Sequence, residues 1–281
     1  MTLSDFNKLN REAAALLFSC CGSETWVNLL MNSFPFQSEK ELLDLATDCW
    51  YNKCKKEDWL LSFSQHPKIG DVKSLTEKFA GKEQAGISTA TVEVIQQLAL
   101  ANEAYELKFG FIFIVCATGK SATEMLTLLQ DRLENSIEEE LNIAMGEQQK
   151  ITVIRFRKML QEADYNFLKS SHITTHVLDT SAGMPGKDIT IRLKEKKNNI
   201  WQTIAQGITN SDGRIPDLLP PGKTIEPGCY KMVFDIGKYY SKLNIRTFYP
   251  EVEIMFNTFD TTHYHIPLLV NPFGYTTYRG S

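Results

Sequence analysis

The hydrophobic pattern of this chain changes its period once, near residues 164–171, and that change limits the folds open to it. Before this point apolar residues recur every three or four positions, and after it they form short runs separated by turn residues. A helix block followed by a strand block, without alternation, favours two domains over one α/β sheet. We therefore expect an all-α domain over residues 1–165 and an all-β sandwich over residues 172–281, joined without a long linker.

The first half carries several helix signals. The spacing predicts an amphipathic helix over 91–109 and another over 4–18. Capping-box patterns, in which Ser precedes Glu by three residues, predict helix starts after Ser38, Ser121 and Ser136, the last helix running to about Ala163. The apolar run 109–117 is compatible with a buried strand or with an irregular buried segment.

The second half predicts seven short strands bounded by Gly, Pro, Asn and Asp, a pattern typical of a β-sandwich. These runs cover residues 172–178, 188–193, 201–208, 230–235, 251–256, 263–270 and 275–279.

Composition excludes some classes of function. A net charge of -4 argues against a nucleic-acid binder, because no basic face is available to neutralise phosphates. The six cysteines form no CxxC pair, which indicates reduced and mostly buried thiols in an intracellular protein. No secretory signal is visible, and the chain ends in Arg-Gly-Ser, unlike a peroxisomal SKL tripeptide. We expect a cytoplasmic or peroxisomal protein.

Four of the five histidines fall at or after residue 172, in the strand half, where His263 and His265 alternate with Tyr264. Residues i and i+2 of a strand share a face, so both rings point the same way. Such a pair suits proton transfer near neutral pH. It is also a zinc ligand pair, with His176 as a third ligand, but no second metal motif accompanies it. We rank a metal-free site above a zinc-dependent cyclic amidohydrolase.

Two polar spots interrupt the helical half. His66 follows an apolar helix and precedes a proline, and Glu83 precedes the long amphipathic helix. A histidine and a carboxylate brought together can perform acid–base chemistry. From the spacing alone, a turn-forming His-Pro and a solvated Glu are the simpler interpretation.

Four segments of the helical half favour the catalytic interpretation instead: HPKIG, EQAG, KFGFIFIVCA and LENSIEEELNIAMGEQQKITVIRFRKML. Together they resemble the 2-oxo-4-hydroxy-4-carboxy-5-ureidoimidazoline (OHCU) decarboxylases of urate degradation over residues 10–163. The resemblance implies an all-α fold that needs no cofactor. It departs at Ala80, where the family usually has a serine whose hydroxyl would bond substrate. It implies His66 and Glu83 as catalytic residues and Pro67, Gln84, Phe111 and Arg155 as substrate contacts.

The strand half carries the segments ITTHVLDTSAGMPGKDITIRL, TNSDGRI, FYPEVEI and HYHIPLLVNPFGYTTYRGS. These resemble the 5-hydroxyisourate hydrolases, the enzymatic branch of the transthyretin-like sandwich, over residues 172–281. The resemblance implies His176, Arg214 and His265 as catalytic residues, with no metal. It also implies that the tail binds substrate through Tyr278, Arg279, Gly280 and Ser281.

The two resemblances together imply a bifunctional enzyme that hydrolyses 5-hydroxyisourate and decarboxylates the product to (S)-allantoin. Small-molecule substrates are the expected partners. The families further imply a homo-oligomer, tetrameric through the C-terminal domain, with dimer contacts through the N-terminal domain. The alternative is a transthyretin-like binding or scaffold protein with a receptor kinase as partner. Retention of His176, Arg214 and His265 favours the enzyme, since a carrier needs no such polar set.

Overall fold

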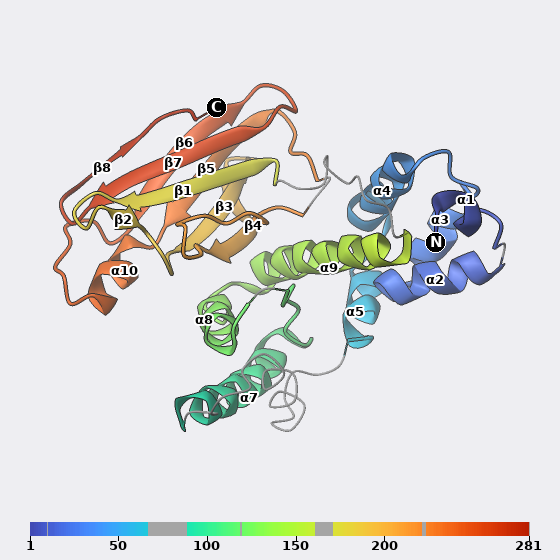
Figure 1. Ribbon diagram of the computed structural model, residues 1–281, viewed down its shortest axis with the longest axis horizontal. Helices are drawn as coiled ribbons and strands as arrows, with labels where there is room; N and C mark the ends of the chain where they lie inside the picture. Colours follow the sequence, from blue (N-terminus) through green and yellow to red (C-terminus); the bar gives the residue numbers. More distant parts are fainter. Residues whose placement is uncertain (10, 67–88, 119, 161–170, 221–222, 281) are drawn as a thin grey trace. The chain divides into compact units, whose positions relative to one another are not determined.

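The computed structural model describes residues 1–9, 11–66, 89–118, 120–160, 171–220 and 223–280. The chain divides into two compact units, Met1–Asp164 and Tyr165–Ser281. The first consists of helices and the second is a β-sandwich (Figure 1), which confirms the expected fold class. Among the described residues, no helix combines the length and the apolar character that crossing a bilayer requires.

The helical unit differs from expectation at its start. The helix expected over 4–18 is interrupted, because Asn7 caps the C-terminus of the first short helix. The Asn7 amide also pairs with the backbone of Phe36, donating to its carbonyl at 2.7 Å and accepting from its N–H at 3.1 Å. The helices are α1 Leu3–Phe6, α2 Arg11–Cys21, α3 Glu24–Met31, α4 Glu39–Asp48, the π-helix η1 Cys49–Lys53, α5 Lys56–Ser64, α7 Thr89–Phe109, α8 Ala122–Arg132 and α9 Ile137–Leu160.

The expected helix caps act at the expected residues. Ser121 and Glu124 form a reciprocal capping box at α8, and Ser136 and Glu139 exchange the same pair of bonds at α9. At α4 the Ser38 hydroxyl accepts from the Glu41 N–H, while the Glu41 carboxylate accepts from Gln37 instead. These bonds satisfy N–H groups that helix starts leave without partners.

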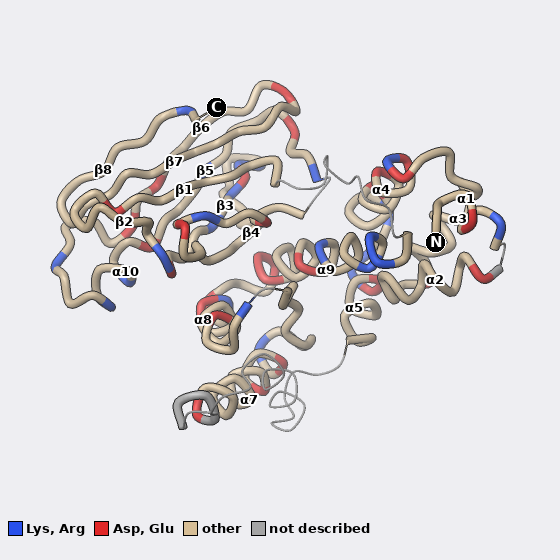
Figure 2. The backbone as a smooth tube through the Cα atoms, viewed as in Figure 1, with Lys and Arg blue, Asp and Glu red and all other residues tan. Residues whose placement is uncertain are grey.

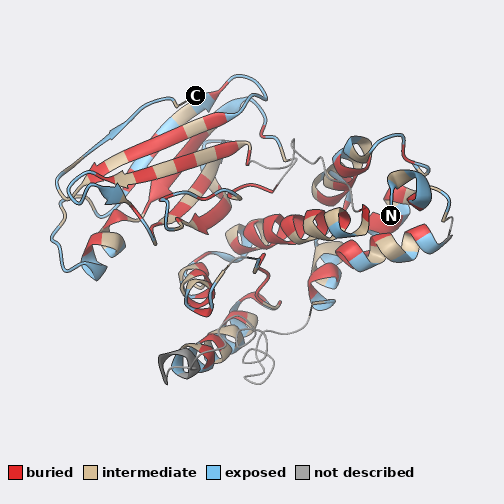
Figure 3. Cartoon of the chain, in the orientation of Figure 1, coloured by how far each residue is buried: buried red, intermediate tan, exposed pale blue. Residues whose placement is uncertain are grey.

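Helix α9 buries about half of its length, most of it in its middle (Figure 3). Its first turn is acidic and its last turn is basic (Figure 2), an arrangement that complements the helix dipole. The middle of α9 buries polar side chains as well as apolar ones, with Gln148 and Thr152 fully inaccessible and Gln149 1% exposed. Buried polar groups need hydrogen-bond partners, so this stretch is where contacts of functional interest are expected.

The apolar run 109–117 proves to be irregular beyond the end of α7 at Phe109, which settles the alternative between strand and irregular segment. Its backbone bonds to side chains instead of to a sheet. The Ile114 carbonyl accepts from Arg132 at 2.8 Å, and the Cys116 N–H donates to Glu147 at 2.6 Å. Hydrogen bonds to buried charged side chains thus take the place of pairing with a neighbouring strand.

The sandwich consists of two four-stranded sheets, ordered β2-β1-β7-β8 and β4-β3-β5-β6. All seven expected strands are present, with ends shifted by a few residues. Two elements were not expected: a short strand in the Gly-Met-Pro-Gly turn, and helix α10, which Asp235 caps. The elements are β1 Ile173–Asp179, β2 Met184–Pro185, β3 Thr190–Lys197, β4 Ile200–Ile208, β5 Gly228–Phe234, α10 Ile236–Lys242, β6 Val252–Thr258, β7 Tyr264–Asn271 and β8 Gly274–Thr277.

Strands β1 and β7 pair in parallel, and their side chains alternate between the core and the outer face of the sheet (Figure 3). Ile173 and Val177 of β1 and Ile266 of β7 lie in the core between the sheets. Thr174 and His176 therefore project from the opposite face, as does His265. This face carries the polar cluster described below.

Candidate active sites

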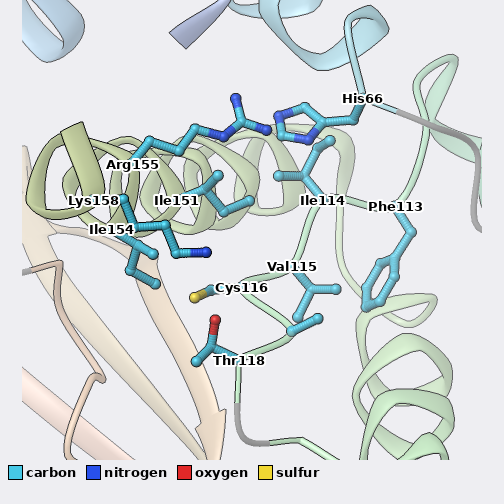
Figure 4. A pocket seen from close by; sticks show the side chains of 11 residues that line it. His66, Phe113, Ile114, Val115, Cys116, Thr118, Ile151, Ile154, Arg155 and Lys158 are labelled. Carbon is cyan, nitrogen blue, oxygen red and sulfur yellow. The ribbon is translucent and has the colours of Figure 1, made fainter. Parts of the chain in front are cut away.

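A pocket of about 410 Å³ lies in the helical unit, against one face of α9 (Figure 4). Ile151, Ile154, Arg155 and Lys158 lie on that face because residues three, four and seven apart share one side of a helix. The irregular segment 113–118 forms another part of the wall, and His66 enters from the end of α5. The pocket therefore combines two cations and an imidazole with an apolar lining.

His66 lies two residues beyond the end of α5, and its backbone N–H donates to the Phe63 carbonyl at 3.1 Å. The ring contacts α9, where Nε2 lies 2.6 Å from Oε1 of Gln148. Burial lowers the pKa of His66, the Gln148 contact raises it, and the nearby Arg155 guanidinium lowers it again. The imidazole is therefore biased toward its neutral form.

Arg155 is oriented by the end of α2. Its Nη1 donates to the carbonyls of Ser19 and Cys20, both at 3.1 Å. Carbonyls in the last turn of a helix lack helical partners, so they accept such bonds readily. Lys158, one turn further along α9, extends an exposed ammonium along the same wall (Figure 4). This arrangement favours an anionic ligand.

A buried ionic network supports the pocket wall from behind. Arg132 and Glu140 are 1% and 0% exposed, and Arg132 Nε donates to Glu140 at 2.8 Å. Asn135 donates to the other carboxylate oxygen at 2.8 Å, and Tyr105 also donates to Glu140. Because Arg132 also binds the Ile114 carbonyl, the network fixes the backbone that lines the pocket.

The sequence also predicts four other site residues in this unit. Phe111 packs in a buried aromatic cluster with Phe63 and Tyr105, at ring distances of 5.4 and 5.9 Å. Its neighbour Phe113, which the sequence analysis did not select, lines the pocket instead. Three further predicted residues lie outside the described part of the chain: Pro67, Glu83 and Gln84.

The second site lies on the outer face of the β1–β7 pair. The parallel register sets Thr174 opposite His265. The Thr174 hydroxyl lies 2.9 Å from Nδ1 of His265 and 2.9 Å from Nε2 of His263. The two rings are stacked at 15° between their planes, with centroids 6.5 Å apart. The hydroxyl therefore bridges both members of the pair predicted from sequence.

His176 and Arg214 are brought together by a backbone contact at Gly213. The Val177 N–H donates to the Gly213 carbonyl at 2.8 Å, and the Arg214 guanidinium lies 3.3 Å from Nδ1 of His176. Gly213 has a φ of 68°, and a Cβ there would lie 2.3 Å from the Val177 carbonyl oxygen. Only glycine fits this approach. Because a guanidinium can only donate, Nδ1 of neutral His176 accepts and Nε2 carries the proton.

The electrostatics of this face favour the neutral forms of His176 and His265. Burial lowers the pKa of His176, and Arg214 lowers it further. Burial also lowers the pKa of His265, assisted by the charges of Arg214, His263 and His176. A neutral imidazole retains the lone pair that a general base requires. The cluster thus combines candidate bases with a fixed cation.

The C-terminal tail returns to His265. The Gly280 N–H donates to the His265 carbonyl at 2.9 Å, and a Cβ on Gly280 would lie 2.4 Å from Cδ2 of that ring. Arg279 lies over the Tyr264 ring at 5.5 Å, and Tyr278 is 60% exposed. Ser281 lies outside the described residues. Gly280 is thus a predicted tail residue that the structure places in contact with His265.

Sequence reasoning missed four polar or thiol side chains that the structure places at these sites: Gln148, Lys158, Cys116 and Thr174. Two of them had a visible signal. Gln148, Thr152 and Arg155 follow the helical spacing of four and three, and Thr174 precedes His176 by two residues on one strand. Over the described residues, no group of three or more His, Cys, Asp or Glu side chains is arranged to hold a metal ion.

Each of the two units matches a known protein family. The family model for OHCU decarboxylase matches residues 7–157, and that of the HIUase/transthyretin family matches residues 173–280. The uric acid degradation bifunctional protein TTL of Arabidopsis thaliana is 32% identical over 317 positions, covering 93% of this chain and 96% of the relative. The 5-hydroxyisourate hydrolase of Mus musculus is 45% identical over 116 residues, which are 40% of this chain and 98% of the relative.

Among solved structures, an (S)-allantoin synthase aligns over all of both chains with 25% identity and a TM-score of 0.45. Fold and sites define a two-domain protein in which a helical unit with a cationic pocket accompanies a transthyretin-like sandwich with a histidine cluster. The chain belongs to the OHCU decarboxylase family, in the bifunctional form that adds a HIUase/transthyretin domain.

Proposed function

We propose that this chain catalyses two successive steps of urate degradation, which end in (S)-allantoin. The observation that carries the proposal is the similarity to a bifunctional uric acid degradation protein along 93% of the chain. We assign the hydrolysis of 5-hydroxyisourate to residues 172–281 and the decarboxylation of OHCU to residues 1–165. Each unit contains a polar cluster suited to its reaction. Neither step, as proposed, requires a cofactor.

In the hydrolase site, a neutral histidine takes a proton from water as the water oxygen bonds to a ring carbonyl carbon of the substrate. The carbon–nitrogen bond then breaks, and the proton passes to the departing nitrogen. His176 and His265 are suited to this role because their lowered pKa values keep lone pairs available. Arg214 can stabilise the negative charge that develops on the substrate oxygens.

In the decarboxylase site, the cations Arg155 and Lys158 attract the anionic substrate into the pocket. Breakage of the carbon–carbon bond releases CO2 and leaves the electron pair on the ring system. The nearby cations stabilise that charge until a proton is added to one face of the carbon. We assign proton transfer to His66 together with Glu83, and substrate contact to Pro67, Gln84 and Phe111.

We further propose that the chain functions as a homo-oligomer, tetrameric through the sandwich and with dimer contacts through the helical unit. Exposed aromatic side chains on the sandwich support this, since Phe248 is 72%, Phe259 75% and Phe273 68% exposed. Aromatic side chains are enriched in the interfaces between protein chains. Sedimentation of the full chain tests the proposal, and a single species at 32.0 kDa would contradict it.

Each activity can be tested in the presence of the other. Freshly prepared 5-hydroxyisourate is added, its ultraviolet absorbance is followed, and the chirality of the product is read by circular dichroism. The wild-type chain should remove the substrate faster than buffer and yield (S)-allantoin. His265→Gln should slow the first step alone, and Arg155→Ala the second alone. No rate above buffer would refute the proposed function, and loss of both steps in either variant would refute the assignment to separate units.

A further inference from the structure

Among the described residues, Gln148 makes the side-chain hydrogen bond to His66. It lies on α9, is fully inaccessible to solvent, and places Oε1 2.6 Å from Nε2 of the ring. A side-chain amide has a donor end and an acceptor end, and a neutral imidazole has one donor and one acceptor. This contact alone therefore allows two assignments of the proton. The second contact of Gln148 decides between them.

The other end of the Gln148 amide faces Thr152, with Nε2 3.3 Å from the hydroxyl oxygen. That hydroxyl lies 3.4 Å from the Cys20 carbonyl and 3.1 Å from the carbonyl of Gln148 itself. Carbonyls only accept, so the single hydroxyl proton goes to one of them. A lone pair of Thr152 then faces the amide nitrogen of Gln148, which donates to it.

Reversal of the amide would turn its oxygen toward Thr152, and the hydroxyl would have to give up its bonds to the two carbonyls in order to donate there, at a site inaccessible to water. Buried polar groups without a partner are strongly disfavoured, so the orientation with Oε1 on His66 is retained. An acceptor at 2.6 Å requires a proton on Nε2 of the ring. His66 therefore donates to Gln148, Gln148 donates to Thr152, and Thr152 donates to a main-chain carbonyl.

We infer that Gln148 is a positioning residue that holds His66 as the Nε2-protonated tautomer, so that Nδ1 keeps the lone pair available to substrate. The inference rests on the proposed decarboxylase function and deepens it. In this state the ring can accept a proton from a substrate hydroxyl at Nδ1, becoming an imidazolium whose Nε2 proton stays on the amide oxygen. The first proton transfer at His66 therefore runs from substrate to ring.

Two further observations agree with this role. The cationic Arg155 beside the ring and the burial of His66 both disfavour a second proton on the resting imidazole. The next residue, Gln149, is equally buried at 1% exposed, but its amide donates to Thr47 at 3.0 Å. Gln148 and Gln149 are thus adjacent and buried but have different partners. Gln149 therefore provides a matched control for substitutions at Gln148.

The test is nitrogen NMR of the full chain carrying 15N-labelled histidine. With five histidines, a His66→Asn variant identifies the resonances of that ring. At a pH where the ring is neutral, wild-type His66 should show a protonated Nε2 and a bare Nδ1. Gln148→Met, which keeps the side-chain length but removes the acceptor, should lose this preference. Gln149→Met should keep it.

Kinetics provide the second measurement. Gln148→Met should lower the kcat of decarboxylation by about 10²-fold with a smaller change in KM, the scale of acid–base catalysis, while Gln149→Met leaves kcat near wild type. The far-ultraviolet circular dichroism of both variants, compared with that of the wild type, reports whether the helical unit is folded. A proton on Nδ1 in wild-type His66 overturns the inference, as does an unchanged kcat in Gln148→Met. An inactive wild type would instead refute the proposed function, because the tautomer is read without turnover.

Discussion

Thr174 and His265 lie opposite each other on two parallel strands, with the Thr174 hydroxyl 2.9 Å from Nδ1 of the ring. The same hydroxyl is 2.9 Å from Nε2 of His263. A hydroxyl has one proton, so it can donate to only one ring and must accept from the other if both bonds form. The donor and acceptor roles of His263 Nε2 and His265 Nδ1 are therefore coupled through Thr174.

Replacement of Thr174 by valine should test this coupling, because valine keeps the branched shape and removes the hydroxyl. We expect kcat/KM of the hydrolase to fall by about 10²-fold, as for loss of an acid–base contribution, while Thr174→Ser retains most of the activity. The measurement is the initial rate of 5-hydroxyisourate decay, and the urea denaturation of the sandwich in each variant is the folding control. Equal rates for the Val and Ser variants would show that the hydroxyl has no role.

Gly280→Ala should impair the hydrolase through a direct clash. The new Cβ would lie 2.4 Å from Cδ2 of His265, so the ring or the tail must move. Displacement of a catalytic group by about 1 Å can cost about 10²-fold in rate. Gly274→Ala is the matched control, because its Cβ would meet nothing closer than 3.6 Å. A wild-type hydrolase rate in Gly280→Ala would show that the close contact between the tail and His265 is not needed for activity.

Arg214→Gln should raise the pKa of both His176 and His265. The arginine charge lowers both pKa values, so its removal makes a second proton on each ring easier to add. The neutral rings needed for base catalysis are lost as pH falls through these pKa values, and the variant should lose them at a higher pH. Titration of the histidine C–H resonances by NMR measures the shift. Unchanged or lower values in the variant would contradict the assigned proximity.

Arg132→Met should destabilise the helical unit, because the fully buried Glu140 carboxylate would lose its charged partner. Removal of one member of a buried ion pair typically costs about 3–5 kcal/mol. The surface residue Lys40, paired with Asp44 and 68% exposed, is the control, and Lys40→Met should cost no more than about 1 kcal/mol. In a urea titration, Arg132→Met should lose decarboxylase activity well before hydrolase activity. Parallel loss of the two activities would argue that the units do not unfold separately.

Local signals account for the parts of the fold that were predicted correctly. Ser121 and Ser136 cap helices because the cap and its partner lie three residues apart. The strand block was recognisable because turn residues bound each run. Helix α10 was missed since its seven residues follow a strand without a long periodic pattern. The interruption after α1 was missed because it depends on Asn7 binding Phe36, a contact 29 residues away.

The same distinction applies to the sites. The sequence by itself determined that His263 and His265 share a face, and family motifs pointed to His66, Arg155, His176 and Arg214. Only the tertiary structure placed Thr174 against His265, Arg214 against His176, and Gln148 against His66 across 82 positions. A strand period or a helix cap is fixed by neighbouring residues. Parallel register, the close approach at Gly213 and the buried donor order along α9 are decided by packing between segments far apart in the chain.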